Sequence, residues 1–285
     1  MLVGAIRGQF QCLNVEWSAA ATRAAHHYRA AGFSAAWSVG DIANAAYYGP
    51  ETVEAALGRC EALLAESPDD RALEANVLTT TACLYAECGR FDDARAAVKR
   101  AAALWEELGQ RAAAQNSLLS LGTVELLDEQ PAAAEAILRA GCESLARRGD
   151  TAFLASRASQ LAESLYRQGR YVEAQTWADT AVDNSAVGDL HAQALSRSIT
   201  AKLAAQAGDL ERADALSNEA VRLLAETDAF NDRANVLLDR AEVLHLAGSD
   251  DAARETARAA ASLLRQKGNS VSAARAEARY ERTLV

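Results

Sequence analysis

Small apolar residues recur along this chain at an interval of about forty residues. One series of alanines carries the period: Ala94, Ala134, Ala174, Ala213 and Ala253. Alanine or glycine also stands twelve residues before and seven residues after each member of the series. Leucine and aromatic residues occupy helical positions around them. A repeat of this length is the signature of stacked supersecondary units, so the pattern predicts an elongated array of helix pairs.

Glycines mark the ends of the predicted helices, because a glycine past a helix end adopts the left-handed conformation that closes the last turn. The glycines expected to close first helices are Gly89, Gly169, Gly208 and Gly248, and those expected to close second helices are Gly109, Gly149, Gly188 and Gly268. These boundaries predict five hairpins over 71–109, 110–149, 150–188, 189–228 and 229–268. A divergent first hairpin over 33–66 turns at Gly49 and Pro50.

The two ends of the chain differ from this regular part. We predict an irregular N-terminal helical segment over 1–32, about six hairpins over 33–268 and a C-terminal capping helix within 269–285. The first ten residues are apolar at Leu2, Val3, Ile6 and Phe10 and lack a polar cap. Because an array normally needs polar terminal units, we expect this end to be cut from a longer protein or covered by another chain, which includes self-association.

Composition favours an all-α chain. Hydrophobic residues make up 50% of the 285 positions but aromatic residues only 6%, so the apolar mass is mostly alanine and leucine, the best helix formers. Three prolines occur, and none interrupts a helical pattern.

The net charge of −10 disfavours nucleic acid and anionic membranes as partners, since both attract basic surfaces. No apolar run reaches the length of a membrane span, and no signal peptide precedes the first helix. The five cysteines are odd in number and lack CxxC spacing, which predicts neither disulfides nor a zinc site. We therefore expect reduced thiols, a cytoplasmic protein, and no metal or cofactor.

Catalytic motifs are missing. The sequence contains no HExxH, GxSxG or GxxxxGK[ST] motif, and its carboxylates fall at helix starts and on stripes expected to face water. His26 and His27 are adjacent and point in different directions, while His191 and His245 stand alone. We see no cluster of titratable groups in the sequence and predict that the chain is not an enzyme.

The spacing small-x₁₁-Ala-x₆-small, with Phe91, Tyr171 and Leu210 nearby, resembles the tetratricopeptide repeat over roughly 33–268. Its period of 39–40 residues exceeds that family's usual 34. Such longer repeats resemble those of the maltose-regulon activator and related bacterial signal-transduction ATPases. The stretch 47–66 is also similar to the C-terminal helical region of actinobacterial regulators that join a nucleotide cyclase, an ATPase and such repeats, although no phosphate-binding loop is present here.

The resemblance implies a right-handed α-solenoid whose first helices line a concave groove. The groove positions that we take as candidate binding residues are Asn76, Asn116, Asn235, Glu163, Tyr166, Arg167, Lys202 and His245. Further groove positions are Thr79, Cys83, Glu87, Leu119, Thr123, Leu126, Ser159, Ser198, Gln206, Leu238 and Glu242. The three asparagines occupy one repeat position, which suggests a ladder of amides that grips a peptide backbone; alternatively, asparagine is merely tolerated near a helix start.

Two functions stay open at this point. The first is a non-catalytic scaffold that binds a protein or peptide in its groove, in bacterial signalling or transcriptional regulation. The alternative is a small-ligand-sensing regulatory domain of a larger ATPase- or cyclase-type regulator. An open, polar-rimmed channel would favour the scaffold, and a closed pocket near Tyr166, Lys202 and His245 would favour the sensor.

Overall fold

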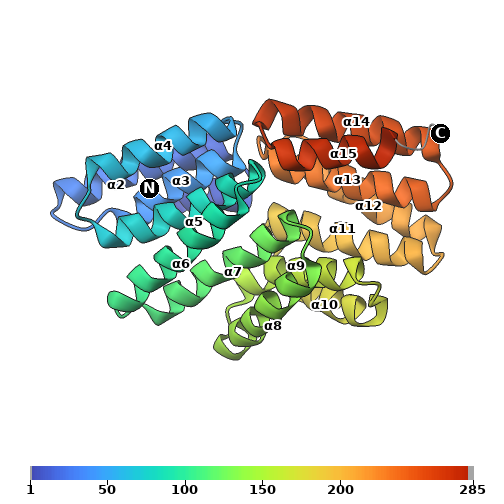
Figure 1. Cartoon of the computed structure of the whole chain (residues 1–285), viewed down its shortest axis with the longest axis horizontal. Helices are drawn as coiled ribbons and strands as arrows, with labels where there is room; N and C mark the ends of the chain where they lie inside the picture. Colours follow the sequence, from blue (N-terminus) through green and yellow to red (C-terminus); the bar gives the residue numbers. More distant parts are fainter. Residues whose placement is uncertain (1, 282–285) are drawn as a thin grey trace.

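The computed structural model describes residues 2–281, and within them the only regular elements are helices joined by short connections (Figure 1). The helices are α1 (Leu2–Phe10), α2 (Asn14–Ala30), α3 (Ala36–Tyr48), α4 (Val53–Glu66), α5 (Arg71–Glu87), α6 (Phe91–Glu107), α7 (Arg111–Leu127), α8 (Pro131–Arg148), α9 (Thr151–Arg167), α10 (Tyr171–Asn184), α11 (Leu190–Gln206), α12 (Leu210–Leu224), α13 (Phe230–Leu246), α14 (Asp250–Lys267) and α15 (Ser270–Glu281). Successive helices form antiparallel hairpins stacked side by side, which confirms the predicted all-α solenoid.

The periodic small residues lie where the helices cross. Every alanine of the series from Ala94 to Ala253 is at most 1% exposed. At the position twelve residues before this series, one repeat has glycine: a methyl group on Gly122 would lie 2.6 Å from the Leu138 side chain. Small side chains at these positions let neighbouring backbones approach, and larger ones would overpack the crossing. The interval that we read in the sequence is therefore the spacing of the packed interfaces.

Glycine closes the helices as predicted at seven of the eight positions, each with φ between 68° and 83°. The prediction for Gly188 is wrong. Helix α10 ends four residues earlier at Asn184, and its cap Ser185 is extended and donates its hydroxyl to the Ala181 carbonyl. The turn after α7 has no glycine, and Glu129 takes the left-handed conformation there with φ of 56°.

The N-terminal segment is more regular than its sequence suggested. Helices α1 and α2 pack as a further hairpin, with Trp17 of α2 buried at 3% exposure and Ile6 of α1 exposed at 52%. The side chains of Leu2 and Val3 lie outside the described part of the structure. The capping helix was expected to reach Leu284; α15 is described to Glu281, and residues 282–285 are not described.

The two ends of the array meet, so that the solenoid closes on itself (Figure 1). Lys267, at the end of α14, is fully buried, and its ammonium group donates hydrogen bonds to the carbonyls of Ala46, Gly49 and Glu51 at 2.7–2.9 Å. The hydroxyl of Ser270 at the start of α15 donates to the Glu87 carbonyl at the end of α5. We call this junction of α3–α5 with α14–α15 the seam.

A second junction lies beside the seam. The Asp228 carboxylate, in the connection between α12 and α13, accepts the backbone N–H groups of Asn14 and Val15 at 2.6 and 2.9 Å. It thereby caps the start of α2, where a negative charge opposes the helix dipole. Gln11 also donates to the Gly188 carbonyl at 2.7 Å. The chain thus covers part of its own N-terminal end, and self-association through this end stays a prediction.

Candidate binding cavity

Closure turns the predicted groove into a cavity of about 1380 Å³. The first helices of the hairpins, α3, α5, α7, α9, α11 and α13, supply most of its wall, and α15, the N-terminal helices and single residues of α6 and α10 add to it. The sixth residue of each first helix faces it: Asp41, Asn76, Asn116, Ser156, Leu195 and Asn235. The lining runs from the second to the seventeenth residue of these helices, so the cavity is about 20 Å long at 1.5 Å rise per residue.

The structure brings most of the sequence candidates together. Asn76, Asn116, Asn235, Glu163, Tyr166, Arg167 and Lys202 all line the cavity. His245 does not, because it is the sixteenth residue of α13 and points away, with its Nδ1 atom 2.7 Å from Asp250 at the start of α14. Among the further groove positions, Leu119 and Ser198 are buried between helices instead.

The three asparagines share the cavity wall, but two of them already have protein partners. Asn76 donates to the Ala36 carbonyl at 3.3 Å, and the Asn116 amide oxygen accepts from Arg148 at 3.2 Å. No hydrogen bond is assigned to the side chain of Asn235 within the described residues. A ladder that grips a peptide therefore stays a prediction, and it would require Asn76 and Asn116 to exchange these bonds for bonds to the peptide.

A buried charge cluster stands near the C-terminal ends of the first helices. Lys202 of α11 is 2% exposed, and its ammonium nitrogen lies 2.5 Å from Glu163, 3.0 Å from Asp239 and 3.7 Å from Glu242. The same nitrogen lies 4.7 Å from the centre of the Tyr166 ring, and the Tyr166 hydroxyl donates to Glu242 at 2.8 Å. Arg167 completes the set through Glu163 at 2.7 Å.

We expected no cluster of titratable groups, and that expectation was wrong. The members neutralise one another, however. Burial alone would raise the pKa of Glu163, but Lys202 and Arg167 lower it to about 2. Burial would lower the pKa of Lys202, but Asp239, Glu163 and Glu242 raise it above its ordinary value. Glu163 and Lys202 are therefore poor proton carriers near neutral pH. Burial raises the pKa of Asp239 even though Lys202 opposes the shift, but its carboxylate is paired with Lys202 at 3.0 Å, an arrangement that suits structure or recognition.

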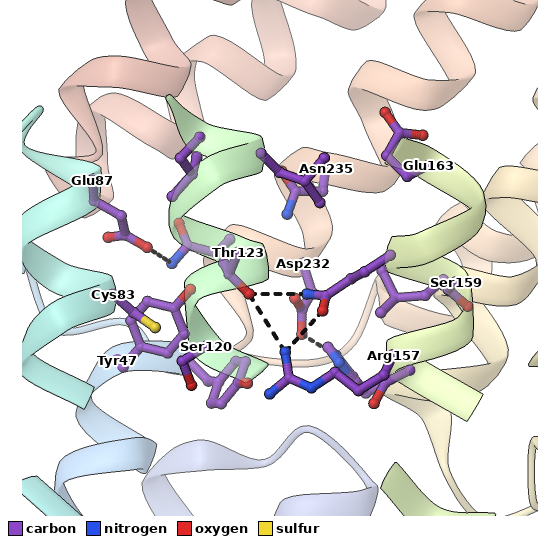
Figure 2. Close-up of a pocket in the computed structure, with 18 of the residues that line it drawn as sticks. Tyr47, Cys83, Glu87, Ser120, Thr123, Arg157, Ser159, Glu163, Asp232 and Asn235 are labelled. Atoms are coloured by element: carbon purple, nitrogen blue, oxygen red, sulfur yellow. Dashed lines mark hydrogen bonds and ion pairs between the residues drawn. The ribbon is translucent and has the colours of Figure 1, made fainter. Parts of the chain in front are cut away.

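Further polar contacts lie in or beside the cavity where the two ends of the solenoid meet. The buried Glu87 carboxyl accepts from Asn231 of α13 at 2.7 Å (Figure 2), and burial raises its pKa to about 8. Burial has the opposite effect on the amine of Lys267 and lowers its pKa to about 8. On α11, His191 pairs with Asp232 of α13 at 2.8 Å and meets the Tyr48 ring edge-on. These contacts join both ends of the solenoid from inside.

Sequence reasoning missed three cations that line the cavity, Arg275 and Arg279 of α15 and Arg157 of α9. Within the part of the chain that the structure describes, Arg157 is the one among them without a carboxylate partner. Its guanidinium donates to Gln160 at 2.8 Å and lies 3.5 Å from the Thr123 hydroxyl of α7 (Figure 2). The signal for it was weak but present. Ser156 stands at the asparagine position of α9, and Arg157, Gln160 and Glu163 continue a polar stripe at helical spacing.

The described residues contain no group of three or more His, Cys, Asp or Glu side chains arranged to hold a metal ion. Within the same residues, no helix is long and apolar enough to cross a membrane. All five cysteines are free, and four of them are buried.

No protein-family model matches this sequence, and neither does any curated protein. Solved structures do resemble the fold. BtubC (BKLC) from P. vanneervenii aligns over 74% of this chain and 87% of its own, with 15% identity and a TM-score of 0.52. A putative kinesin light chain with TPR-like repeats from Podosopora anserina covers 65% of this chain and 92% of its own (16% identity, TM-score 0.44). The APC/C hetero-tetramer Cut9-Hcn1 aligns over 88% of this chain and 55% of its own (13% identity, TM-score 0.38). The likeness to BtubC establishes a shared helical-repeat fold and nothing further.

Proposed function

We propose that this chain is a non-catalytic binding module that takes the end of a protein partner, as a short extended peptide, into its central cavity. The observation that carries the proposal is the cavity itself, which has a mixed polar and apolar lining and is closed to the side by the seam. Its length of about 20 Å corresponds to about six residues of extended chain at 3.3 Å each. A closed ring of helices favours a chain end, since an internal segment would have to thread through it.

A small-ligand sensor is the second candidate, and the closure of the groove favours it. The volume of about 1380 Å³ exceeds the roughly 300–1,000 Å³ of pockets for drug-sized molecules, which is why we place the peptide first. The free thiols suit a reducing cytoplasm. The similarity of residues 47–66 to bacterial regulators favours a role in signalling or transcriptional control.

The cavity can be tested by filling it. Replacing Ser156 with tryptophan places an indole in the middle of the wall, so we expect it to reduce capture of peptides from a synthetic random hexapeptide mixture by at least about tenfold, equivalent to 1.4 kcal/mol. Captured peptides are identified by mass spectrometry after gel filtration of the complex. The matched control is Val172→Trp on the outer surface, where Val172 is 85% exposed. Equal capture by both variants, each with wild-type circular dichroism, would refute the proposal.

The asparagine ladder has its own test. Changing Asn76, Asn116 and Asn235 together to alanine removes three side-chain amides from the cavity wall. If these amides bind a peptide backbone, the triple variant should bind selected hexapeptides about tenfold more weakly or worse, because each lost bond contributes about 0.5–1.5 kcal/mol. Isothermal titration calorimetry gives the comparison. Unchanged affinity would eliminate the ladder while leaving the cavity proposal in place.

A further inference from the structure

Arg157 differs from every other cation of the cavity. Four other Lys and Arg side chains line it, and each pairs with a carboxylate: Arg167 with Glu163, Lys202 with Glu163, Asp239 and Glu242, Arg275 with Glu129, and Arg279 with Glu242. Within residues 2–281, Arg157 has no carboxylate within 4.0 Å. Its partners are the neutral side chains of Gln160 and Thr123. A half-buried charge without a counter-charge lowers stability. Proteins keep such a cost mainly at functional sites.

The neighbours of Arg157 are arranged as a receptor. Gln160 accepts from the guanidinium through its Oε1 atom and donates to the Thr123 hydroxyl oxygen through Nε2 at 3.1 Å, so it holds both side chains in place. Because the Thr123 oxygen accepts N–H groups from both Gln160 and Arg157, its own proton remains available to donate. The free N–H groups of Arg157 and the Thr123 O–H therefore provide donors towards one region of the cavity (Figure 2).

The electrostatic influence of Arg157 extends across the cavity. Burial raises the pKa values of Tyr48 on α3 and Cys83 on α5, and in both cases the positive charge of Arg157 is the largest opposing effect. The cavity as a whole has more acidic than basic side chains. A ligand with several negative charges would be repelled by that lining, whereas a single negative charge can be matched by Arg157 alone.

We propose that Arg157 and Thr123 bind the carboxylate of the molecule that enters the cavity. The planar guanidinium fork matches a carboxylate with two parallel hydrogen bonds. One turn before Arg157 on α9, Phe153 also lines the cavity and is 46% exposed, and Trp37, stacked on Trp105 at 5.3 Å, is 63% exposed. The part of the ligand that carries the carboxylate should therefore be apolar. This inference rests on the proposed binding function and specifies its ligand as an apolar monocarboxylate, either a peptide C-terminus or a free organic acid.

Two pairs of probes separate these sources. The first pair is the random hexapeptide mixture with free C-termini and the same mixture with amidated C-termini. The second pair is phenylacetate and its neutral analogue phenylacetamide, compared by the shift in thermal unfolding temperature. We expect the wild-type chain to prefer the carboxylate of at least one pair by about tenfold or more, since hydrogen bonds to charged groups contribute about 1.5–3 kcal/mol. The pair that shows the preference identifies the source.

Arg157→Gln should abolish that preference, while Arg147→Gln, an exposed arginine of α8 outside the cavity, should keep it. The urea midpoint of Arg157→Gln should equal or exceed that of the wild type, because an uncompensated charge has been removed; a clearly lower midpoint would show a structural role and overturn the proposal. The proposal would also be overturned if Ser156→Trp blocks peptide capture but neither amidation nor Arg157→Gln changes it. In that case the cavity function stands. If Ser156→Trp does not reduce any peptide capture, then the cavity function is refuted, and the carboxylate site with it.

Discussion

Replacing Lys202 with methionine is expected to lower the free energy of unfolding by about 3–5 kcal/mol, because it removes the buried cation that three largely buried carboxylates share. Lys202 is 2% exposed and lies within 4 Å of Glu163, Asp239 and Glu242. Methionine is close in length, so packing changes little and the loss is mainly electrostatic. Urea denaturation followed by circular dichroism measures it. The matched control is Lys99→Met, at an exposed lysine of α6, which should change stability by less than about 0.5 kcal/mol.

Removing Lys202 should also change how stability depends on pH between pH 7 and pH 5. In the wild type, the pKa of Glu163 is lowered to about 2, below its unfolded value of about 4.3. Its stabilisation is therefore present above about pH 4.3 and is lost as the pH falls towards 2. Without Lys202, burial and mutual repulsion raise the folded-state pKa values of these carboxyls. Lys202→Met should then become more stable as the pH falls from 7 to 5. A gap to the wild type that stays constant over this range would contradict the role given to Lys202.

Replacing Lys267 with methionine is expected to open the ring. Its ammonium group is the donor to three carbonyls, those of Ala46, Gly49 and Glu51, and hydrogen bonds to charged groups contribute about 1.5–3 kcal/mol each. Once that donor is lost, the carbonyls regain hydrogen bonds most readily by contacting water, which requires the ends to separate. We expect a larger radius of gyration in small-angle X-ray scattering and faster amide hydrogen exchange in α3–α4 and α14–α15.

The same scattering experiment on Lys99→Met should reproduce the wild-type curve. Helical content should stay near wild type in both variants, because each hairpin packs mainly against its neighbours and not across the seam. If Lys267→Met keeps the wild-type radius of gyration and exchange rates, then the seam is held by its other contacts, such as Ser270 with Glu87 and Asn231 with Glu87, and the importance assigned to Lys267 is wrong.

The helical array could be predicted because its determinants are local. An alanine at each crossing is needed for close approach of adjacent helices, and the crossing recurs with every repeat, so the interval from Ala94 to Ala253 fixed the stacking. Gly188 misled us because α10 is three residues shorter than α6 and α9, which the turn residues alone do not reveal. The register also placed Lys202 in the groove correctly, although we did not recognise its partners. Glu163 and Glu242 stand at the same helix position one repeat away on either side, a coincidence visible in the sequence.

Closure could not be predicted in the same way. Whether the ends of a solenoid meet depends on small rotations summed over six repeats, and no single residue encodes that sum. The residues that hold the seam also gave no sequence signal, since lysine near a helix end usually faces water and stabilises the dipole, whereas Lys267 is enclosed by backbone carbonyls. Arg157 was missed for a related reason: its lack of a carboxylate partner is a property of the assembled cavity and not of helix α9.

The unusual scarcity of lysine has a practical consequence. Of the three lysines in the chain, two are enclosed, at 2% and 0% exposure, and Lys99 is exposed on α6. Among the lysine side chains, an amine-reactive dye or surface should therefore attach to the native protein at Lys99, which does not line the cavity. Molecules coupled through Lys99 would share one orientation. Any additional modification at Lys267 would report that the ring had opened.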